Sequence, residues 1–411
     1  MKAVQFHVTI PRFIYATIFG KLFKSAHYGP FSMLKYVDVP EPQVSDAPND
    51  EWVKIRTKLS GVCGSELNTI FLHDSPALEA YTSSPFTFGH ENIGIITEKG
   101  KEVKGFEVGD RVAIHPMLPC KTRGIEKVCE LCEKGEFSSC LNFTKGNLPP
   151  GFDNMLCRDT GGGWSPYFLA HQFQLYKLPD SVSNENGVMV EPFCTSLHSV
   201  LRCFPKDTDT VLVIGAGMIG ITVIAALRAL GTKARIVVLA KYKFQGDWCK
   251  KYGADDIIYL REGDYYENLA NLLGVTLKKP ILGKRIVVDG GFDVIYECVG
   301  NDTAVNDALR FAKPGGSIVL IGLVGTTKKV DWSFSWFKEL YLFGTNTSST
   351  ELFNGERIPT FQLAINWMAE GKIDLEPLLS RKLKLDDYKK AIKMMTEKGK
   401  HKIVKIVFEF D

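Results

Sequence analysis

The stretch Thr210-Val211-Leu212-Val213-Ile214-Gly215-Ala216-Gly217-Met218-Ile219-Gly220 decides the fold of this chain. Its first half is a run of aliphatic, mostly β-branched residues, which predicts a buried strand. Its second half is a G-x-G-x-x-G turn that opens an apolar helix reaching to about Leu230. In that context the turn binds a dinucleotide, because the helix N-terminus presents unpaired N–H groups to the phosphates. The predicted cofactor contacts are Gly215, Ala216, Gly217, Met218, Ile219 and Gly220.

The rest of the chain divides around this motif. Strand-like runs at 235–239, 292–296 and 317–321 alternate with helical segments, which predicts an α/β fold with a doubly wound parallel sheet. Before about Val182, short β-branched runs alternate with Gly, Pro and Asp turns, which indicates a β-rich domain. The tail after about residue 350 predicts one amphipathic helix and a last strand.

Length and composition exclude several classes of protein. The 411 residues allow two or three domains, and 50 Lys and Arg residues nearly balance 47 Asp and Glu residues, so no nucleic-acid partner is expected. No apolar run is long enough to span a membrane and no secretory signal is recognisable, so no membrane partner is expected either. Ten cysteines at metal-like spacing in so long a chain favour thiolate ligands in a reducing, cytoplasmic setting.

Candidate ligands of a reactive metal occur in three segments. Cys63 lies in Gly61-Val62-Cys63-Gly64-Ser65-Glu66, His90 and Glu91 follow Gly89, and Glu191 precedes Pro192. A thiolate, an imidazole and a carboxylate can hold zinc and leave one position for water or substrate. We predict a catalytic zinc at Cys63, His90, Glu91 and Glu191. With a dinucleotide turn in the same chain, this site indicates redox chemistry between an alcohol and a carbonyl.

A second group of thiols comprises Cys120, Cys129, Cys132 and Cys140. Four thiolates complete the coordination of zinc and leave no reactive position, which predicts a structural zinc in a lobe at about 118–142. Free surface thiols are the alternative. The chain would then carry two zinc ions.

The end of the second cofactor-domain strand indicates which nicotinamide nucleotide binds. NAD sites usually place Asp or Glu there to bind the ribose hydroxyls. This chain has Ala240, followed by Lys241 and Lys243, which can pair with an additional phosphate. The pattern favours NADP over NAD; in the alternative interpretation the two lysines are only solvated.

These motifs, in this order, resemble the zinc-dependent medium-chain dehydrogenase/reductase superfamily, especially its alcohol, polyol and threonine dehydrogenases. The resemblance covers nearly the whole chain apart from an additional N-terminal stretch. It implies a GroES-like catalytic domain formed by residues 1–182 and 348–411, and a Rossmann cofactor domain formed by residues 183–347. It also implies a small alcohol or carbonyl substrate and a homodimer or homotetramer.

The resemblance implies roles for individual residues. Cys63 and His90 match zinc ligands, Glu91 matches a carboxylate that binds zinc or moves in when water leaves, and Glu191 matches a ligand that binds directly or through water. Ser65 matches the hydroxyl that accepts the alcohol proton. A second set lies around these groups: Glu66, which orients a zinc-bound histidine, and Thr195 and Ile219 beside the nicotinamide.

Three positions depart from the family pattern. Eight residues separate Cys120 from Cys129 where the family usually has two, so the additional six must loop out if all four thiolates share one zinc. Asn68 stands where many members carry the outer histidine of a proton relay, and it cannot transfer a proton near neutral pH. Ala240 replaces the usual acidic residue.

The substrate and the role of residues 8–35 stay open. That apolar and aromatic stretch predicts a helix or loop on the domain surface; a lid, a subunit contact and a membrane-surface anchor are alternatives. With the loop from Phe71 to Phe86 it is expected to set substrate size. Alternative functions are an NAD-dependent polyol or threonine-type dehydrogenase and, remotely, a non-catalytic binding protein on the same scaffold.

Overall fold

A computed structural model describes residues 1–411, which form two compact units. The first unit comprises Met1–Glu191 and Ile358–Asp411, and the second comprises Pro192–Arg357. The units divide inside helix α5 (Val190–Arg202) and at the hairpin strand β18 (Glu356–Pro359). The domain boundaries at 182/183 and 347/348 stay a prediction from the sequence. None of the helices combines the length and apolar composition that crossing a bilayer requires.

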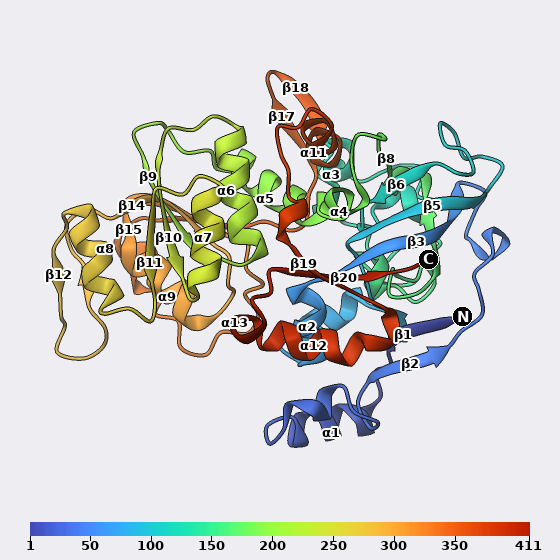
Figure 1. Cartoon of the computed structure of the whole chain (residues 1–411), viewed down its shortest axis with the longest axis horizontal. Helices are drawn as coiled ribbons and strands as arrows, with labels where there is room; N and C mark the ends of the chain where they lie inside the picture. Colours follow the sequence, from blue (N-terminus) through green and yellow to red (C-terminus); the bar gives the residue numbers. More distant parts are fainter. The chain divides into compact units, whose positions relative to one another are not determined.

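The second unit contains a six-stranded sheet in the order β11-β10-β9-β14-β15-β16, in which every pair of neighbours is parallel (Figure 1). Its strands are β9 (Thr210–Ile214), β10 (Arg235–Ala240), β11 (Asp256–Tyr259), β14 (Phe292–Glu297), β15 (Ala312–Leu320) and β16 (Tyr341–Gly344). The predicted doubly wound parallel sheet is confirmed. The strand order reverses between β9 and β14, and dinucleotides bind at such a reversal.

Helices cover both faces of this sheet because its strands are apolar on both sides. Leu212 and Ile214 of β9 share a buried cluster with side chains of α8 (Tyr265–Leu273) and α9 (Asp302–Phe311). Side chains alternate along a strand, so Val213 points to the opposite face. There Gly220 of α6 (Met218–Ala229) approaches it. The glycine-rich turn therefore joins the central strand to a helix packed tightly against it.

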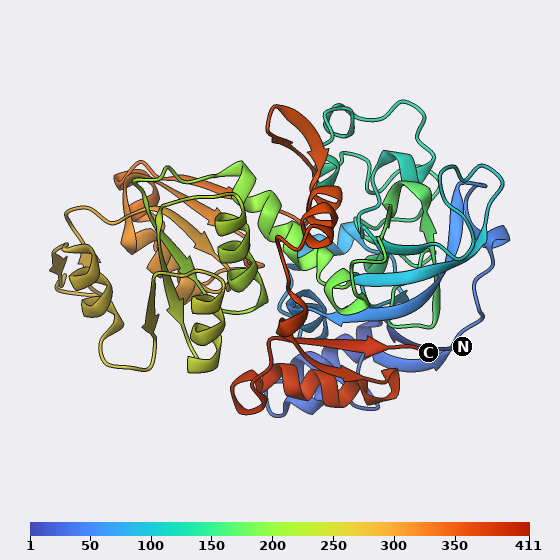
Figure 2. The same cartoon turned by 45° about the horizontal axis from the view of Figure 1, so that its top comes forward.

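The first unit contains a β-rich core built on β3 (Trp52–Val62). The order β19-β20-β3-β5-β6-β8, with β7 also paired to β3, makes a seven-stranded sheet. The other strands are β5 (Asn92–Lys99), β6 (Arg111–Ile114), β7 (Tyr167–His171), β8 (Leu175–Lys177), β19 (Leu379–Leu383) and β20 (Lys405–Glu409). Figure 2 shows the C-terminal β20 running within this unit, and Ile406 pairs with Val62. The last strand is thereby placed beside Cys63.

A smaller sheet in the order β2-β1-β4 flanks this core, with β1 at Lys2–Phe6, β2 at Leu34–Asp38 and β4 at Phe86–Thr87. Between β1 and β2 the chain forms α1 (Ile10–Phe19) and a short 3-10 turn, η1 (Lys24–His27). Figure 1 shows α1 at the lower edge of the view, outside α2 (Gly64–Ile70) and α12 (Tyr388–Thr396). The additional N-terminal stretch thus contains a surface helix.

Candidate metal and cofactor sites

Strand pairing brings three of the predicted reactive ligands together. Cys63 follows β3 directly and is the N-cap of α2, while His90 and Glu91 precede β5. Because β3 and β5 pair with Ser60 opposite Asn92, the two segments meet at the same end of the sheet. The ligand atoms of Cys63, His90 and Glu91 all lie within 4.8 Å of one another.

The His90 ring is oriented by Glu66. Its Nδ1 atom lies 2.6 Å from Glu66 Oε1, and the second oxygen of Glu66 accepts the Cys63 backbone N–H at 2.7 Å. Nε2 is therefore the nitrogen left for a metal, and the Cys63 side chain is a further hydrogen-bond partner of His90. Burial opposes both charges, but Glu66 holds the pKa of His90 well above its usual value and His90 holds the pKa of Glu66 below its own.

Glu91 has one paired and one unpaired oxygen. Oε2 forms a buried ion pair with Lys405 of β20, while Oε1 is buried without a hydrogen-bond partner. A Cβ atom at Gly61 would lie 1.8 Å from Oε2, so only glycine permits this approach. Burial opposes the charge of Lys405, yet Glu91 raises the pKa of this ammonium group above its usual value.

Glu191 lies near this cluster but outside the set of ligand atoms within 4.8 Å. It is buried in the first turn of α5, and burial raises its pKa to about 7, with His90 lowering and Glu91 raising it. Ser65 lies in the first turn of α2, and its Oγ is buried without a partner. Asn68 lies further along the same helix.

These donors fit zinc. The set offers a thiol, an imidazole nitrogen freed by Glu66, and a buried carboxylate oxygen that no protein group satisfies. Zinc binds such nitrogen, sulfur and oxygen donors, and a carboxylate commonly holds the far nitrogen of its histidine ligand. A buried oxygen without a partner is costly unless a cation binds it.

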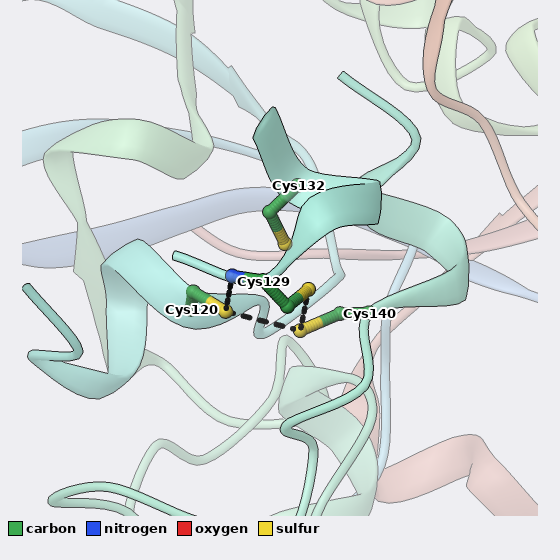
Figure 3. Close-up of side chains that lie close together, drawn as sticks. All are labelled: Cys120, Cys129, Cys132 and Cys140. Carbon is green, nitrogen blue, oxygen red and sulfur yellow. Dashed lines mark hydrogen bonds between the residues drawn. The ribbon is translucent and has the colours of Figure 1, made fainter. Parts of the chain in front are cut away.

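The four lobe cysteines converge on one point, as Figure 3 shows. Their sulfur atoms lie within 4.8 Å of one another; Cys120 and Cys140 are 3.5 Å apart, and Cys129 and Cys140 are 3.9 Å apart. No cysteine of the chain forms a disulfide. Three of these sulfur atoms accept backbone N–H groups: Cys120 from Cys129, Cys129 from Leu141, and Cys140 from Asn142. Such hydrogen bonds stabilise a thiolate, although burial raises the pKa of the Cys120 thiol above its usual value.

The extended spacing between Cys120 and Cys129 is accommodated by a buried arginine. Arg123 lies in the 3-10 turn η4 (Cys120–Arg123) and donates to the carbonyl oxygens of Leu118, Lys145 and Leu148, and of two further residues. These hydrogen bonds hold the additional residues in a loop, and Cys120 stays within the group of four cysteines. Sequence reasoning missed Arg123, because nothing local distinguishes a buried arginine from a solvated one.

The glycine-rich turn has the shape that a dinucleotide requires. Gly215 has a φ of +100°, and a Cβ atom at Gly220 would lie 1.8 Å from the Gly215 carbonyl oxygen. At Gly217, by contrast, no atom lies within 4 Å of where a Cβ would stand. The first and third glycines serve turn and packing, and the second borders open space where a pyrophosphate can approach the backbone. Met218 and Ile219 open α6.

A basic group surrounds Tyr242, just after β10 ends at Ala240. Lys241 Nζ lies 5.5 Å from the centre of the Tyr242 ring, and the Arg261 guanidinium lies 5.3 Å from it. Lys243 opens α7 (Lys243–Lys251). Arg261 was missed in the sequence because it follows β11, and only the pairing of β11 with β10 brings it here. Thr195 lies in α5, where its carbonyl oxygen accepts from Ser199.

Comparison with known proteins agrees with this arrangement. Residues 49–180 match the alcohol dehydrogenase GroES-like domain family, and residues 219–370 match the zinc-binding dehydrogenase family. An L-idonate 5-dehydrogenase of Vitis vinifera is 29% identical over 332 residues, which cover 80% of this chain and 80% of that protein. A sorbitol dehydrogenase of Bacillus subtilis (strain 168) is 27% identical over 360 residues, 87% of this chain and 89% of that protein.

A solved structure with the same fold is a short chain alcohol dehydrogenase from Escherichia coli CFT073 complexed with NADH. It superimposes with a TM-score of 0.73 at 23% sequence identity, covering 100% of this chain and 99% of that chain.

Proposed function

Because the chain belongs to the zinc-dependent medium-chain dehydrogenase/reductase superfamily and is an alcohol dehydrogenase-like oxidoreductase, we propose that it interconverts a polyol and its ketone with NADP. The observation that carries the proposal is the cluster of Cys63, His90 and Glu91, with one buried carboxylate oxygen left unpaired. The polyol class is taken from the sorbitol and idonate dehydrogenases among the relatives.

The chain's own residues would divide the work at this site. Cys63, His90 and Glu91 would hold zinc. Glu191 would be a further ligand, bound directly or through water, as the family resemblance implies. Ser65 is the group we assign to accept the alcohol proton, since its Oγ is buried, unpaired and in the helix that Cys63 caps. Glu66 would fix the imidazole, and Lys405 would hold the other Glu91 oxygen. When bound, zinc supplies Lewis-acid polarisation of the substrate oxygen and the nicotinamide carries the hydride.

The preference for NADP is supported by the charges around Tyr242. Ala240 offers no carboxylate to bind or repel a ligand there, while Lys241, Lys243 and Arg261 supply three cations. Guanidinium and ammonium groups form strong charge-assisted hydrogen bonds with phosphate. NAD is the alternative, since the structurally similar Escherichia coli enzyme binds NADH. Thr195 and Ile219 are proposed to line the nicotinamide.

Three further proposals accompany this function. The four lobe thiols would hold a structural zinc, giving two ions per chain. Ten free cysteines support a reducing, cytoplasmic setting. A homodimer or homotetramer is supported by the exposed Trp336, Phe337 and Tyr341 near the edge strand β16.

The decisive experiment measures bound zinc and kcat/KM with NADP and NAD on a panel of polyols, for the native chain and Cys63→Ser. We expect about two zinc ions in the native chain, and in the variant one zinc and a loss of turnover of several orders of magnitude. Cys203→Ser, a thiol outside both clusters, is the matched control and should keep both. Native turnover in Cys63→Ser would refute the site, and a native preference for NAD would refute the cofactor assignment alone.

A further inference from the structure

The N-terminal segment, residues 8–35, turns its apolar side chains toward solvent. Helix α1 buries only Ala16, whereas Ile10, Ile14 and Ile18 are 77%, 50% and 54% exposed. These three residues are spaced by four and therefore lie along one face of the helix. A helix on a globular protein normally directs its apolar face to the core. Here the apolar face points outward.

The exposed face continues beyond the helix. Phe13 is exposed on α1, and Leu22 and Phe31 follow it at 75% and 68% exposure. The Tyr15 ring lies 5.0 Å from the Phe19 ring and 5.7 Å from that of Phe31, so the aromatic groups adjoin. We call Ile10, Phe13, Ile14, Ile18, Leu22 and Phe31 the N-terminal apolar face. Large apolar side chains exposed together in one short segment mark a binding site more often than isolated ones do.

The opposite side of the segment is fixed to the first unit. Ala26 and His27 are buried, and the His27 ring packs 5.2 Å from Phe71 at the end of α2. The Ser32 hydroxyl is buried and donates to the Gly29 carbonyl oxygen at 2.7 Å, which fixes the turn that follows His27. The apolar face is therefore presented by a packed segment.

The charge of the segment indicates what covers this face. Residues 1–37 contain no Asp or Glu, and Arg12, Lys21, Lys24 and Lys35 lie within residues 8–35. These four residues carry +4, whereas the whole chain carries +3, so the remainder of the chain carries −1. Lys21 and Lys24 are exposed, and Arg12 is half-buried. The cationic excess of the sequence therefore lies in the same segment as the apolar face.

The N-terminal apolar face could be buried by a second copy of the chain or by a membrane surface. The positive charge of the segment distinguishes these two partners. A symmetric contact with a second copy would bring the same cations of both chains together, because each subunit contributes the same surface. A bilayer with anionic headgroups attracts the cations and accepts the apolar side chains at the boundary of its acyl chains. We propose that residues 8–35 dock the enzyme on an anionic membrane surface. The proposal takes up the membrane-surface alternative for this stretch and is independent of the proposed reaction.

The test is co-sedimentation of the full chain with vesicles of phosphatidylcholine alone and of phosphatidylcholine mixed with phosphatidylglycerol. We expect at least roughly tenfold tighter binding to the anionic vesicles, and weaker binding as salt rises. The double variants Ile14→Gln/Ile18→Gln and Lys21→Gln/Lys24→Gln should each lower that affinity at least about tenfold. Ile281→Gln/Leu282→Gln, at residues 102% and 86% exposed in the second unit, is the control and should bind like the native chain.

Equal binding by native chain and variants, or no binding to anionic vesicles, would overturn the proposal. A lipid-free dimer that Ile14→Gln/Ile18→Gln dissociates would assign the face to a second copy instead. The variant Phe13→Trp provides a test that does not depend on the loss-of-binding variants folding correctly. Its tryptophan fluorescence should shift to shorter wavelength with anionic vesicles and not with phosphatidylcholine vesicles. An unchanged spectrum with anionic vesicles would count against docking.

Discussion

Glu66 illustrates how one side chain can prepare a metal site. Its two oxygens bind His90 Nδ1 and the Cys63 backbone N–H, so it positions both neighbouring ligands. In Glu66→Gln the side-chain amide keeps the shape of the carboxylate. It lacks the negative charge that makes His90 a stronger zinc ligand. We expect zinc affinity at this site to fall about 10–100-fold, as is common when such a partner is removed.

Competition with a zinc chelator, read out as zinc retained per chain, measures this change. Glu297→Gln is the control, since Glu297 is equally buried but accepts backbone N–H groups of Val299 and Gly300 in the second unit. Unchanged retention in Glu66→Gln would show that Glu66 only packs there.

Arg261 and Lys241 give a prediction about cofactor choice. Each can form a charge-assisted hydrogen bond with a ribose phosphate, worth about 1.5 kcal/mol when exposed. The double variant Lys241→Ala/Arg261→Ala should therefore lose roughly a hundredfold in kcat/KM with NADP and little with NAD. Lys251→Ala is the control, because that ammonium lies 4.8 Å from the Trp248 ring in a comparable contact on α7. Equal losses with both cofactors would contradict a phosphate-specific role.

Some of these residues were predictable from sequence and others were not. Cys63, His90 and Glu91 lie in short motifs made of residue types that commonly bind zinc. The pairing of β3 with β5 alone brings the two motifs together. Lys405 meets Glu91 across 314 residues, and its segment reads only as a strand with a lysine in it. Arg261 likewise depends on a neighbouring strand. Local sequence patterns therefore identify the candidate metal ligands. The residues that bind these ligands and change their charge state come from distant segments and cannot be found in this way.

At the scale of elements, the same limit applies. The strand and glycine turn at 210–220 specify their own conformation, so the parallel sheet could be predicted. The position of β20 beside β3 could not be predicted, because an apolar run does not indicate which strand it will pair with. The lobe shows both cases: its thiols were recognisable, but the Arg123 clamp that accommodates the longer spacing is a tertiary feature.

The Lys338 side chain caps the C-terminal end of α9. Its ammonium donates to the carbonyl oxygens of Arg310 and Ala312, and burial lowers its pKa to about 8. Between about pH 8 and the ordinary lysine pKa near 10.4, the unfolded chain holds a proton that the folded chain has lost. The free energy of unfolding therefore rises with pH across this window, by up to about 3 kcal/mol from this group.

Lys338→Met removes the titration. Denaturant unfolding at several pH values should show the native chain gaining stability relative to Lys338→Met as the pH rises through that window. Lys372→Met, which replaces an exposed lysine over Trp367, is the matched surface control. A stability difference between the native chain and Lys338→Met that stays constant with pH would mean that the Lys338 ammonium is equally stable in the folded and unfolded states.

At the scale of the whole molecule, metal and cofactor are assigned to different units. Every candidate zinc ligand lies within Met1–Glu191, while the glycine turn and the basic group around Tyr242 lie within Pro192–Arg357. A ligand stabilises the part of the native state that it binds, by about 2.7 kcal/mol at a hundred times its Kd. Zinc removal and NADP addition should therefore act on separate regions of the chain.

Hydrogen–deuterium exchange can resolve the two effects. A chelator should speed exchange most in peptides containing Cys63, His90 and residues 118–142, with little change in β9 and α6. Saturating NADP should slow exchange most in peptides around Gly217 and Tyr242, and zinc-depleted protein should still show this protection because the turn contains no metal ligand. If zinc removal abolished the NADP protection, the cofactor site would depend on the metal sites, and the division of roles between the units would be wrong.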